Sequence, residues 1–253
     1  MNIFEKILSL KRQEIKQIKD FEFREAVGQT RSLKDALSKP GISVIAEIKM
    51  KSPSKGVIFP NADPVHIAKG YESAGAAAIS VLTDQSFFGG SLDILNSVRN
   101  AVSIPVIRKD FIIEQKQISE TIHYNGDAFL LIADALDQDS LKQLINIGKG
   151  AGLEFLVEYH AEKHAEFIFA LNPEIVGINC RNLKTMATDI TYFEKMISSL
   201  PLKSVKVAES GIHTSDDLAY VSDLGYDAAL IGTSLMKTGN PGKALQTLLG
   251  ELS

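Results

Sequence analysis

Six polar side chains in this sequence stand where short apolar runs end. They are three glutamates, two lysines and one asparagine: Glu47, Lys49, Lys109, Glu158, Asn179 and Glu209. Carboxylates and ammonium groups that share one apolar-walled space shift one another's pKa values and can act as acid and base pairs. Each charged residue could instead end its strand and point into solvent. Because all six follow the same kind of run, we favour a catalytic cluster.

The elements that must position these side chains alternate regularly along the chain. Apolar runs lie at 43–49, 77–82, 104–109, 128–132, 153–158, 175–179, 205–209 and 228–232. Stretches of helical periodicity separate them, at 64–74, 92–101, 114–124, 140–151, 162–171, 190–200, 214–224 and 241–249. This alternation predicts parallel strands joined by right-handed crossovers. Eight units favour a closed (β/α)₈ barrel, in which all the carboxyl ends of the strands meet at one mouth.

An open doubly wound sheet is the alternative to the barrel. Such a sheet would be expected to have a glycine-rich fingerprint after its first strand, where this chain has residues 47–51, Glu-Ile-Lys-Met-Lys. The length of 253 residues suits one barrel, which commonly has about 250 residues. No linker or change of composition divides the chain, so we expect a single domain over 1–253.

Residues 1–40 precede the first unit and are predicted to form a helical extension. Apolar side chains that form one stripe support this interpretation: Phe4, Ile7, Leu8, Ile15 and Ile18. The interspersed acidic residues favour a solvated face over a basic membrane-binding face. Pro40 and Gly41 then end the helix.

Composition excludes several classes of function. A net charge of -4 makes nucleic acid an improbable partner, and no apolar stretch approaches the ~20 residues of a membrane span. The amino terminus is too charged for a signal peptide. One cysteine excludes an intramolecular disulfide and indicates a reducing, cytoplasmic location. Of the five histidines only His160 and His164 have a metal-like spacing, and we expect them to flank the start of a helix, so we predict no metal site. Cys180 has no histidine partner, so we predict no thiol nucleophile.

Two further patterns lie beyond the predicted strands. Ser210 and Gly211 follow the seventh run, and Gly232, Thr233 and Ser234 follow the eighth. Small residues let backbone N–H groups approach an anion, and this fold commonly holds phosphate in these two loops. Ordinary turn chemistry is the alternative. After the second run, residues 87–90 (Phe-Phe-Gly-Gly) either cap the core or wall an aromatic pocket.

Taken together, these motifs resemble the indole-3-glycerol phosphate synthase family. The resemblance covers every strand end in order, through E-x-K-x-x-S-P-S-x-G from Glu47, R-K-D-F from Arg108, Glu158, G-I-N-x-R-N-L from Gly177, E-S-G-I from Glu209 and G-T-S from Gly232. It implies a monofunctional, cytoplasmic lyase of tryptophan biosynthesis that needs no cofactor or metal. The implied reaction closes 1-(2-carboxyphenylamino)-1-deoxyribulose 5-phosphate to indole-3-glycerol phosphate with loss of CO₂ and water. We expect a monomer.

The resemblance also implies roles for individual residues. Lys109 matches the family's general acid, and Glu158 matches an acid/base carboxylate, with Glu47 alongside and Glu209 in the same cluster. Lys49 is expected to contact the substrate carboxylate or donate a proton during dehydration, and Asn179 to orient a hydroxyl. The expected phosphate and nearby substrate contacts are Ser52, Arg181, Ser210, Gly211, Gly232, Thr233 and Ser234. The expected apolar wall is Phe88, Phe111, Leu131, Leu183 and Ile231, and the extension is expected to cover this end of the barrel.

Two other functions are compatible with the pattern. A lysine Schiff-base aldolase on the same fold would use Lys109 or Lys49 as nucleophile. A non-enzymatic phosphate-binding barrel would bind the anion without turnover, and it would leave the three clustered carboxylates unexplained.

Overall fold

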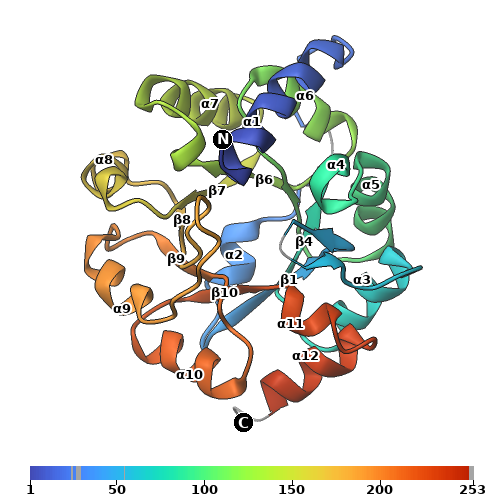
Figure 1. Cartoon of the computed structure of the whole chain (residues 1–253), viewed down its shortest axis with the longest axis vertical. Coiled ribbons are helices and arrows are strands. Elements are labelled where there is room, and N and C mark those ends of the chain that lie inside the picture. Colours follow the sequence, from blue (N-terminus) through green and yellow to red (C-terminus); the bar gives the residue numbers. More distant parts are fainter. Residues whose placement is uncertain (24, 27–29, 54, 251–253) are drawn as a thin grey trace.

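A computed structural model describes residues 1–23, 25–26, 30–53 and 55–250 of the chain. Within these residues eight parallel strands close into a barrel in the order β1-β10-β9-β8-β7-β6-β5-β4. Helices lie around the barrel between consecutive strands (Figure 1). The predicted (β/α)₈ barrel is therefore confirmed.

The barrel strands lie within one or two residues of the predicted apolar runs. They are β1 (Ser43–Ile48), β4 (Ala78–Leu82), β5 (Val106–Lys109), β6 (Ala128–Ile132), β7 (Glu154–Tyr159), β8 (Ile175–Asn179), β9 (Val205–Glu209) and β10 (Ala228–Ile231). A short antiparallel pair that the sequence did not predict follows β1 and consists of β2 (Lys51–Ser52) and β3 (Gly56–Val57).

The crossover helices also follow the predicted periodicity. They are α3 (Pro64–Ser73), α5 (Leu92–Ala101), α6 (Gln115–His123), α7 (Gln138–Gly150), α8 (Ala165–Leu171), α9 (Tyr192–Met196), α10 (Ser215–Asp223) and α12 (Pro241–Gly250). Two short helices stand directly after strands, α4 (Gln85–Phe88) after β4 and α11 (Thr233–Met236) after β10. No helix in the described part of the chain is long and apolar enough to cross a membrane.

Apolar side chains form two layers because successive residues of a strand point to opposite faces. The outer layer packs between strands and helices and includes Phe129, Val157 and Ile178. The inner layer fills the barrel and includes Leu130 and Leu156. Both faces of each strand are buried, which explains why the strands are nearly continuous apolar runs.

The amino-terminal extension differs from the predicted continuous helix. Helix α1 (Ile3–Glu14) continues as the 3₁₀ turn η1 (Ile15–Gln17), and a second helix, α2, spans only Leu33–Leu37. The described residues between η1 and α2 are not helical. An unbroken helix of 40 residues would be about 60 Å long, so the chain must bend to remain packed on a barrel.

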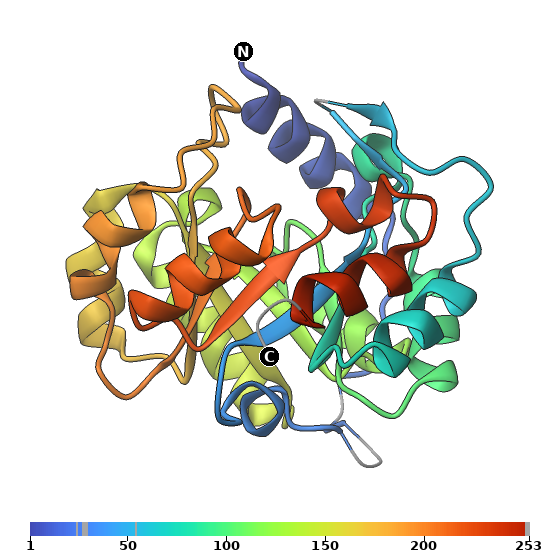
Figure 2. The ribbon, with the colours of Figure 1, turned by 90° about the horizontal axis from the view of Figure 1, so that it is seen from below.

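Figure 2 shows α1 and α2 at opposite ends of the barrel. Phe4 and Leu8 of α1 pack with Phe111, just beyond the carboxyl end of β5. At the other end, the Glu154 carboxylate at the start of β7 accepts hydrogen bonds from Ser32 Oγ and Lys34 N, both at 2.8 Å. Segments of the extension therefore lie against both the mouth and the floor of the barrel, whereas the sequence predicted only the mouth.

We predict that Leu37→Ala lowers the free energy of unfolding by about 2–5 kcal/mol, because Leu37 is fully buried in the floor of the barrel. The value of kcat/KM should stay at the wild-type level, since the predicted catalytic residues follow the carboxyl ends of the strands, at the other end of the barrel. Urea unfolding and steady-state kinetics test this, with the exposed Lys39→Ala as control. A fall in kcat/KM of the fully folded variant would contradict a purely structural role for α2.

Candidate active site

A cavity opens at the carboxyl ends of the strands. Every site residue that the sequence predicted lines it, with the exception of Leu131. Ser54, which belongs to the S-P-S motif, lies outside the described residues. The barrel topology thus brings together residues that are far apart in the sequence.

The prediction for Leu131 is wrong because its side chain points away from the cavity. Leu131 packs in the outer layer, whereas its neighbours Leu130 and Ile132 line the cavity. Ile231 lines the cavity, but its side chain belongs to the outer layer, and Leu230 faces inward. An uninterrupted apolar strand buried on both faces does not reveal which residues point inward, so the sequence offered no signal for this choice.

Lys109 stands at the centre of the polar part of the cavity. Its Nζ lies 2.7 Å from Glu209 Oε2 and 3.2 Å from Glu158 Oε2. The Asn179 side-chain amide donates a hydrogen bond of 2.8 Å to Glu158 Oε1. Its carbonyl oxygen accepts one of 3.0 Å from Arg181 N. Side chains of β7 and β9 therefore hold the ammonium group of Lys109, and Asn179 of β8 holds Glu158.

Glu47 and Lys49 form the second ion pair of the cavity. With Lys109, Glu158 and Glu209 they make up what we call the charge cluster. Glycines leave room for it: a Cβ on Gly232 would lie 2.4 Å from Glu47 Oε1, and one on Gly177 would lie 2.3 Å from Glu209 Oε1. Side chains at these two positions would therefore collide with the carboxylates.

The charges and the burial of the cluster set its protonation. Burial alone would lower the pKa of Lys109, but Glu209, Glu158 and Glu47 outweigh it and raise that pKa above the ordinary value of 10.5. Burial would raise the pKa of Glu47, but Lys49 and Lys109 hold it below its ordinary value. Burial, together with the charge of Glu158, raises the pKa of Glu209 to about 8. Glu209 can therefore exchange a proton near neutral pH.

Glu209 has one further feature of a reactive group. Its second carboxylate oxygen, Oε1, is buried and has no hydrogen-bond partner among the described residues. A buried polar atom without a partner costs free energy and is available to a ligand. The cavity therefore offers a firmly protonated lysine beside a carboxyl group of raised pKa, which is a pairing suited to general acid–base catalysis.

The loops after β9 and β10 form one wall of the cavity. Ser210 and Gly211 both have positive φ, at 71° and 74°, an uncommon conformation for serine. Ser234 Oγ donates a hydrogen bond of 3.1 Å to Ile212 O and so joins the two loops. Cys180 lies behind them, and burial raises the pKa of its thiol to about 12, which agrees with the predicted free, unreactive cysteine.

An apolar wall faces these loops. Phe88 and Phe111 lie with ring centroids 6.4 Å apart, and Leu183 completes the predicted part of the wall. Sequence analysis missed further lining residues: Pro53, Leu82, Asp84, Asp110, Leu130, Ile132, Met186, Ile212, His213 and Leu230. Asp110 belongs to the R-K-D-F motif, which was a usable signal. Pro53 and Ile212 likewise belong to motifs quoted for the resemblance. The remaining residues depend on strand direction or on the path of a loop, which no sequence pattern indicated.

Comparison with known proteins identifies relatives of the whole chain. The family model described as indole-3-glycerol phosphate synthase matches residues 4–248. The indole-3-glycerol phosphate synthase of Halalkalibacterium halodurans is 44% identical over 247 residues, which are 96% of this chain and 95% of that relative. The enzyme of the same name from Shouchella clausii is 43% identical over 252 residues, with 98% of each chain covered.

Solved structures with distant sequences share the fold. Thiamine phosphate pyrophosphorylase from Pyrococcus furiosus superposes with a TM-score of 0.61 at 15% identity, covering 87% of this chain and 96% of that one. A mandelate oxidase variant gives a TM-score of 0.64 at 14% identity, covering 89% and 79%. At these identities the likeness concerns the fold alone.

We predict that Glu209→Gln weakens the pH dependence of stability in the ligand-free protein. Folded Glu209 stays protonated up to about pH 8, whereas in the unfolded chain it ionises near its ordinary value of 4.5. The stabilisation from the raised pKa is complete below the unfolded value and is lost as pH rises toward the folded value.

The wild type should therefore lose up to about 1.4 kcal/mol per pH unit from this group between about pH 5.5 and 7.5, and the variant should not. Urea unfolding at several pH values measures the difference. Identical pH profiles would show that the pKa of Glu209 is ordinary in the folded protein.

Proposed function

The chain belongs to the indole-3-glycerol phosphate synthase family, and from that premise we propose how its cavity carries out the family's reaction. The activity is a carboxy-lyase step of tryptophan biosynthesis. It converts 1-(2-carboxyphenylamino)-1-deoxyribulose 5-phosphate into indole-3-glycerol phosphate, CO₂ and water. The observation that carries the proposal is Lys109 Nζ, held between Glu158 and Glu209 at the mouth of the barrel.

The reaction requires two proton transfers to oxygen and one from carbon. In ring closure, the aromatic carbon that bears the carboxylate attacks the ketone carbon, and the ketone oxygen takes up a proton. Departure of CO₂ then returns its bonding electrons to the ring. In dehydration, the new hydroxyl leaves with a second proton while a base removes a proton from the carbon next to nitrogen.

Lys109 is the proposed acid for ring closure. Its ammonium is fully charged at neutral pH because the surrounding carboxylates raise its pKa. A lysine that stays protonated delivers a proton only as charge develops on the acceptor oxygen, and it also stabilises that charge electrostatically. Lys49, the second ammonium in the cavity, is the proposed partner of the substrate carboxylate or the acid for dehydration.

The carboxylates are the proposed proton acceptors. Glu158 contacts Lys109 and Asn179, so the proton that it accepts from the carbon next to nitrogen can pass to the lysine and restore its ammonium. Glu209, whose pKa is raised and whose Oε1 lacks a partner, can accept and release a proton near neutral pH. Glu47 is the proposed counter-ion that fixes Lys49. Asn179 is proposed to orient a substrate hydroxyl through the same amide that contacts Glu158.

The two ends of the substrate match the two walls of the cavity. The benzene ring is proposed to lie against Phe88, Phe111, Leu130, Ile132 and Leu183. The phosphate is proposed to bind the backbone N–H groups of the loops after β9 and β10, with Ser210, Gly211, Gly232, Thr233 and Ser234. Ser52 and Arg181 also line the cavity and are proposed to contact the phosphate or other polar substrate groups.

The Schiff-base alternative receives no support at Lys109. A nucleophilic lysine needs a lowered pKa so that the amine is neutral, but the carboxylates around Lys109 act in the opposite direction. The chemistry proposed here uses the lysine as an ammonium.

We further propose that the chain works as a monomer in the cytoplasm, with its extension as part of a single barrel domain. Apolar side chains of α1 and α2 are buried against the barrel, which supports one domain. The free Cys180 thiol fits a reducing compartment.

We predict that Lys109→Ala lowers kcat by a factor on the order of 10²–10⁴, because it removes the proposed acid. The assay follows the fluorescence of the indole product after the carboxyphenylamino-deoxyribulose phosphate is added to purified protein. Circular dichroism of the variant serves as the folding control. A near-wild-type kcat would contradict the assignment, and a wild-type chain without turnover would contradict the function itself.

We predict that Ser234→Asp raises KM strongly, because it places a carboxylate where a phosphate dianion must bind. The matched control is Ser234→Ala, which removes the hydrogen bond to Ile212 without adding charge. Turnover of dephosphorylated substrate should suffer less than turnover of the phosphorylated form. An equal loss with both substrates would mean that the variant damages the fold and that these loops do not hold the phosphate.

A further inference from the structure

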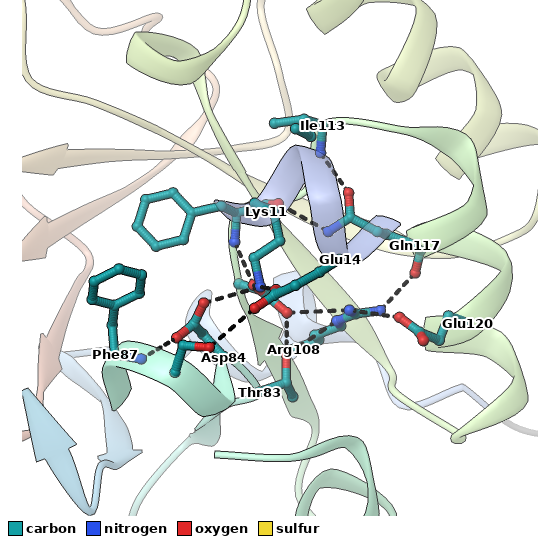
Figure 3. Close-up of polar contacts among 12 residues, drawn as sticks. Lys11, Glu14, Thr83, Asp84, Phe87, Arg108, Ile113, Gln117 and Glu120 are labelled. Atoms are coloured by element: carbon teal, nitrogen blue, oxygen red, sulfur yellow. Dashed lines mark hydrogen bonds and ion pairs between the residues drawn. The ribbon is translucent and has the colours of Figure 1, made fainter. Parts of the chain in front are cut away.

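The R-K-D-F motif contains two charged residues that the proposed chemistry does not use. Arg108 and Asp110 flank Lys109, and they are only 2% and 3% exposed. Arg108 Nη2 lies 3.2 Å from Asp110 Oδ2 and 2.8 Å from Glu120 Oε2, while Thr83 Oγ1 donates a hydrogen bond of 2.7 Å to Asp110. Figure 3 shows this network beneath helix α1.

A lysine of the extension enters the same network. Lys11 of α1 is 5% exposed, and its Nζ lies 3.0 Å from Asp84 Oδ2 and 2.9 Å from Asp110 Oδ1. It also lies 2.8 Å from Glu14, whose carboxylate accepts a hydrogen bond of 3.1 Å from Ser86 Oγ. We call Lys11, Glu14, Asp84 and Asp110 the Lys11 cluster.

The location of the Lys11 cluster is not explained by docking of α1 alone. A buried ammonium needs compensating charges, and a well-packed apolar side chain would often stabilise such a contact equally well. The apolar face of α1 already provides contacts of that kind through Phe4, Ile7 and Leu8. Docking of α1 therefore does not require a buried charge at position 11, and the residues that Lys11 contacts indicate its role.

Each of the two aspartates that Lys11 contacts stabilises a turn next to one phenylalanine of the apolar wall. Asp84 Oδ1 accepts a hydrogen bond of 2.8 Å from Phe87 N and so caps α4, the helix that ends in Phe88. Asp110, which follows Lys109 in the sequence, accepts a hydrogen bond of 2.8 Å at its Oδ1 from Phe111 N. Lys11 thus bridges the turn before Phe88 and the turn before Phe111.

Helix α1 also supports one of these rings directly. The Phe4 ring centroid lies 6.1 Å from that of Phe111, on the helix that carries Lys11. Neither Phe4 nor Lys11 lines the cavity, but the residues that they contact, Phe111, Asp84 and Asp110, do line it. The loops after β9 and β10, which are the proposed phosphate site, make no hydrogen bond or ion pair with the Lys11 cluster within the described residues.

We propose that Lys11 is a positioning residue that fixes the aromatic half of the active site. By holding Asp84 and Asp110 together, it sets the separation of Phe88 and Phe111 and so the slot for the benzene ring of the substrate. This inference rests on the proposed function, which supplies an aromatic substrate. It predicts that loss of Lys11 weakens recognition of the ring while recognition of the phosphate is retained.

The test uses the full chain and two probes, one for each half of the substrate. The probe 2-(methylamino)benzoate presents the carboxyphenylamino group, and glycerol 3-phosphate presents the phosphate end. Lys11→Met removes the charge, and Arg12→Met is the matched control because Arg12 carries the same charge on the exposed face of α1. Lys11→Gln, which keeps N–H donors, replaces the methionine variant if that one does not fold.

Lys11→Met should bind the benzoate probe about threefold to thirtyfold more weakly, the range typical of residues that act on a site without touching the ligand. Its affinity for glycerol 3-phosphate should stay within about twofold of wild type, as should both affinities of Arg12→Met. Substrate KM should rise, because the ring slot is loosened.

Equal losses for both probes would overturn the inference, because they would indicate a general structural role. Unchanged binding of the benzoate probe would overturn it as well. Failure of the proposed function is distinguishable, since it would appear as absence of turnover in the wild-type chain whatever the variants bind.

Discussion

Buried charge is the constraint on which the active site of this protein depends. Three carboxylates and two ammonium groups share the mouth of the barrel, and an unpaired ion there would cost several kcal/mol. Each lysine is therefore held by glutamate: Lys49 by Glu47, and Lys109 by Glu158 and Glu209. Burial, together with the charge of Glu158, raises the pKa of Glu209, so this carboxyl keeps its proton most easily. The buried cluster thus contains a group that titrates near neutral pH.

The barrel supplies the geometry that this compensation requires. Parallel strands place every carboxyl end at one mouth, and alternation along each strand turns selected side chains inward. Gly177 and Gly232 lack the Cβ atoms that would occupy the space of the carboxylates. The extension lies against both ends of the barrel: α2 buries Leu33 and Leu37 at the floor, and α1 reaches the mouth through apolar contacts and the Lys11 cluster. A second set of buried charges therefore lies next to the first.

Sequence patterns predicted the barrel and the charge cluster of the cavity for a clear physical reason. Strands buried on both faces are apolar throughout, so a charged residue such as Glu158 or Lys109 at the end of one stands out. Because such a strand is apolar at every position, its sequence does not show which side chains point into the barrel. The prediction therefore named Leu131, whereas Leu130 and Ile132 face the cavity. The contacts of Lys11 with Asp84 and Asp110 were also beyond prediction, because they depend on where a separate helix docks. The path of the extension to both ends of the barrel had no local signal either.

A comparison of proton binding by wild type and Lys109→Met tests the central claim most directly. Potentiometric titration of the two folded, ligand-free proteins between about pH 6 and pH 8 counts the protons that each one holds. If buried charges must be compensated, a neighbouring carboxylate takes up a proton when the ammonium is removed, and the two proteins hold nearly the same number. If the variant holds one proton fewer throughout this range, the carboxylates remain ionised without their lysine. That result would contradict the account.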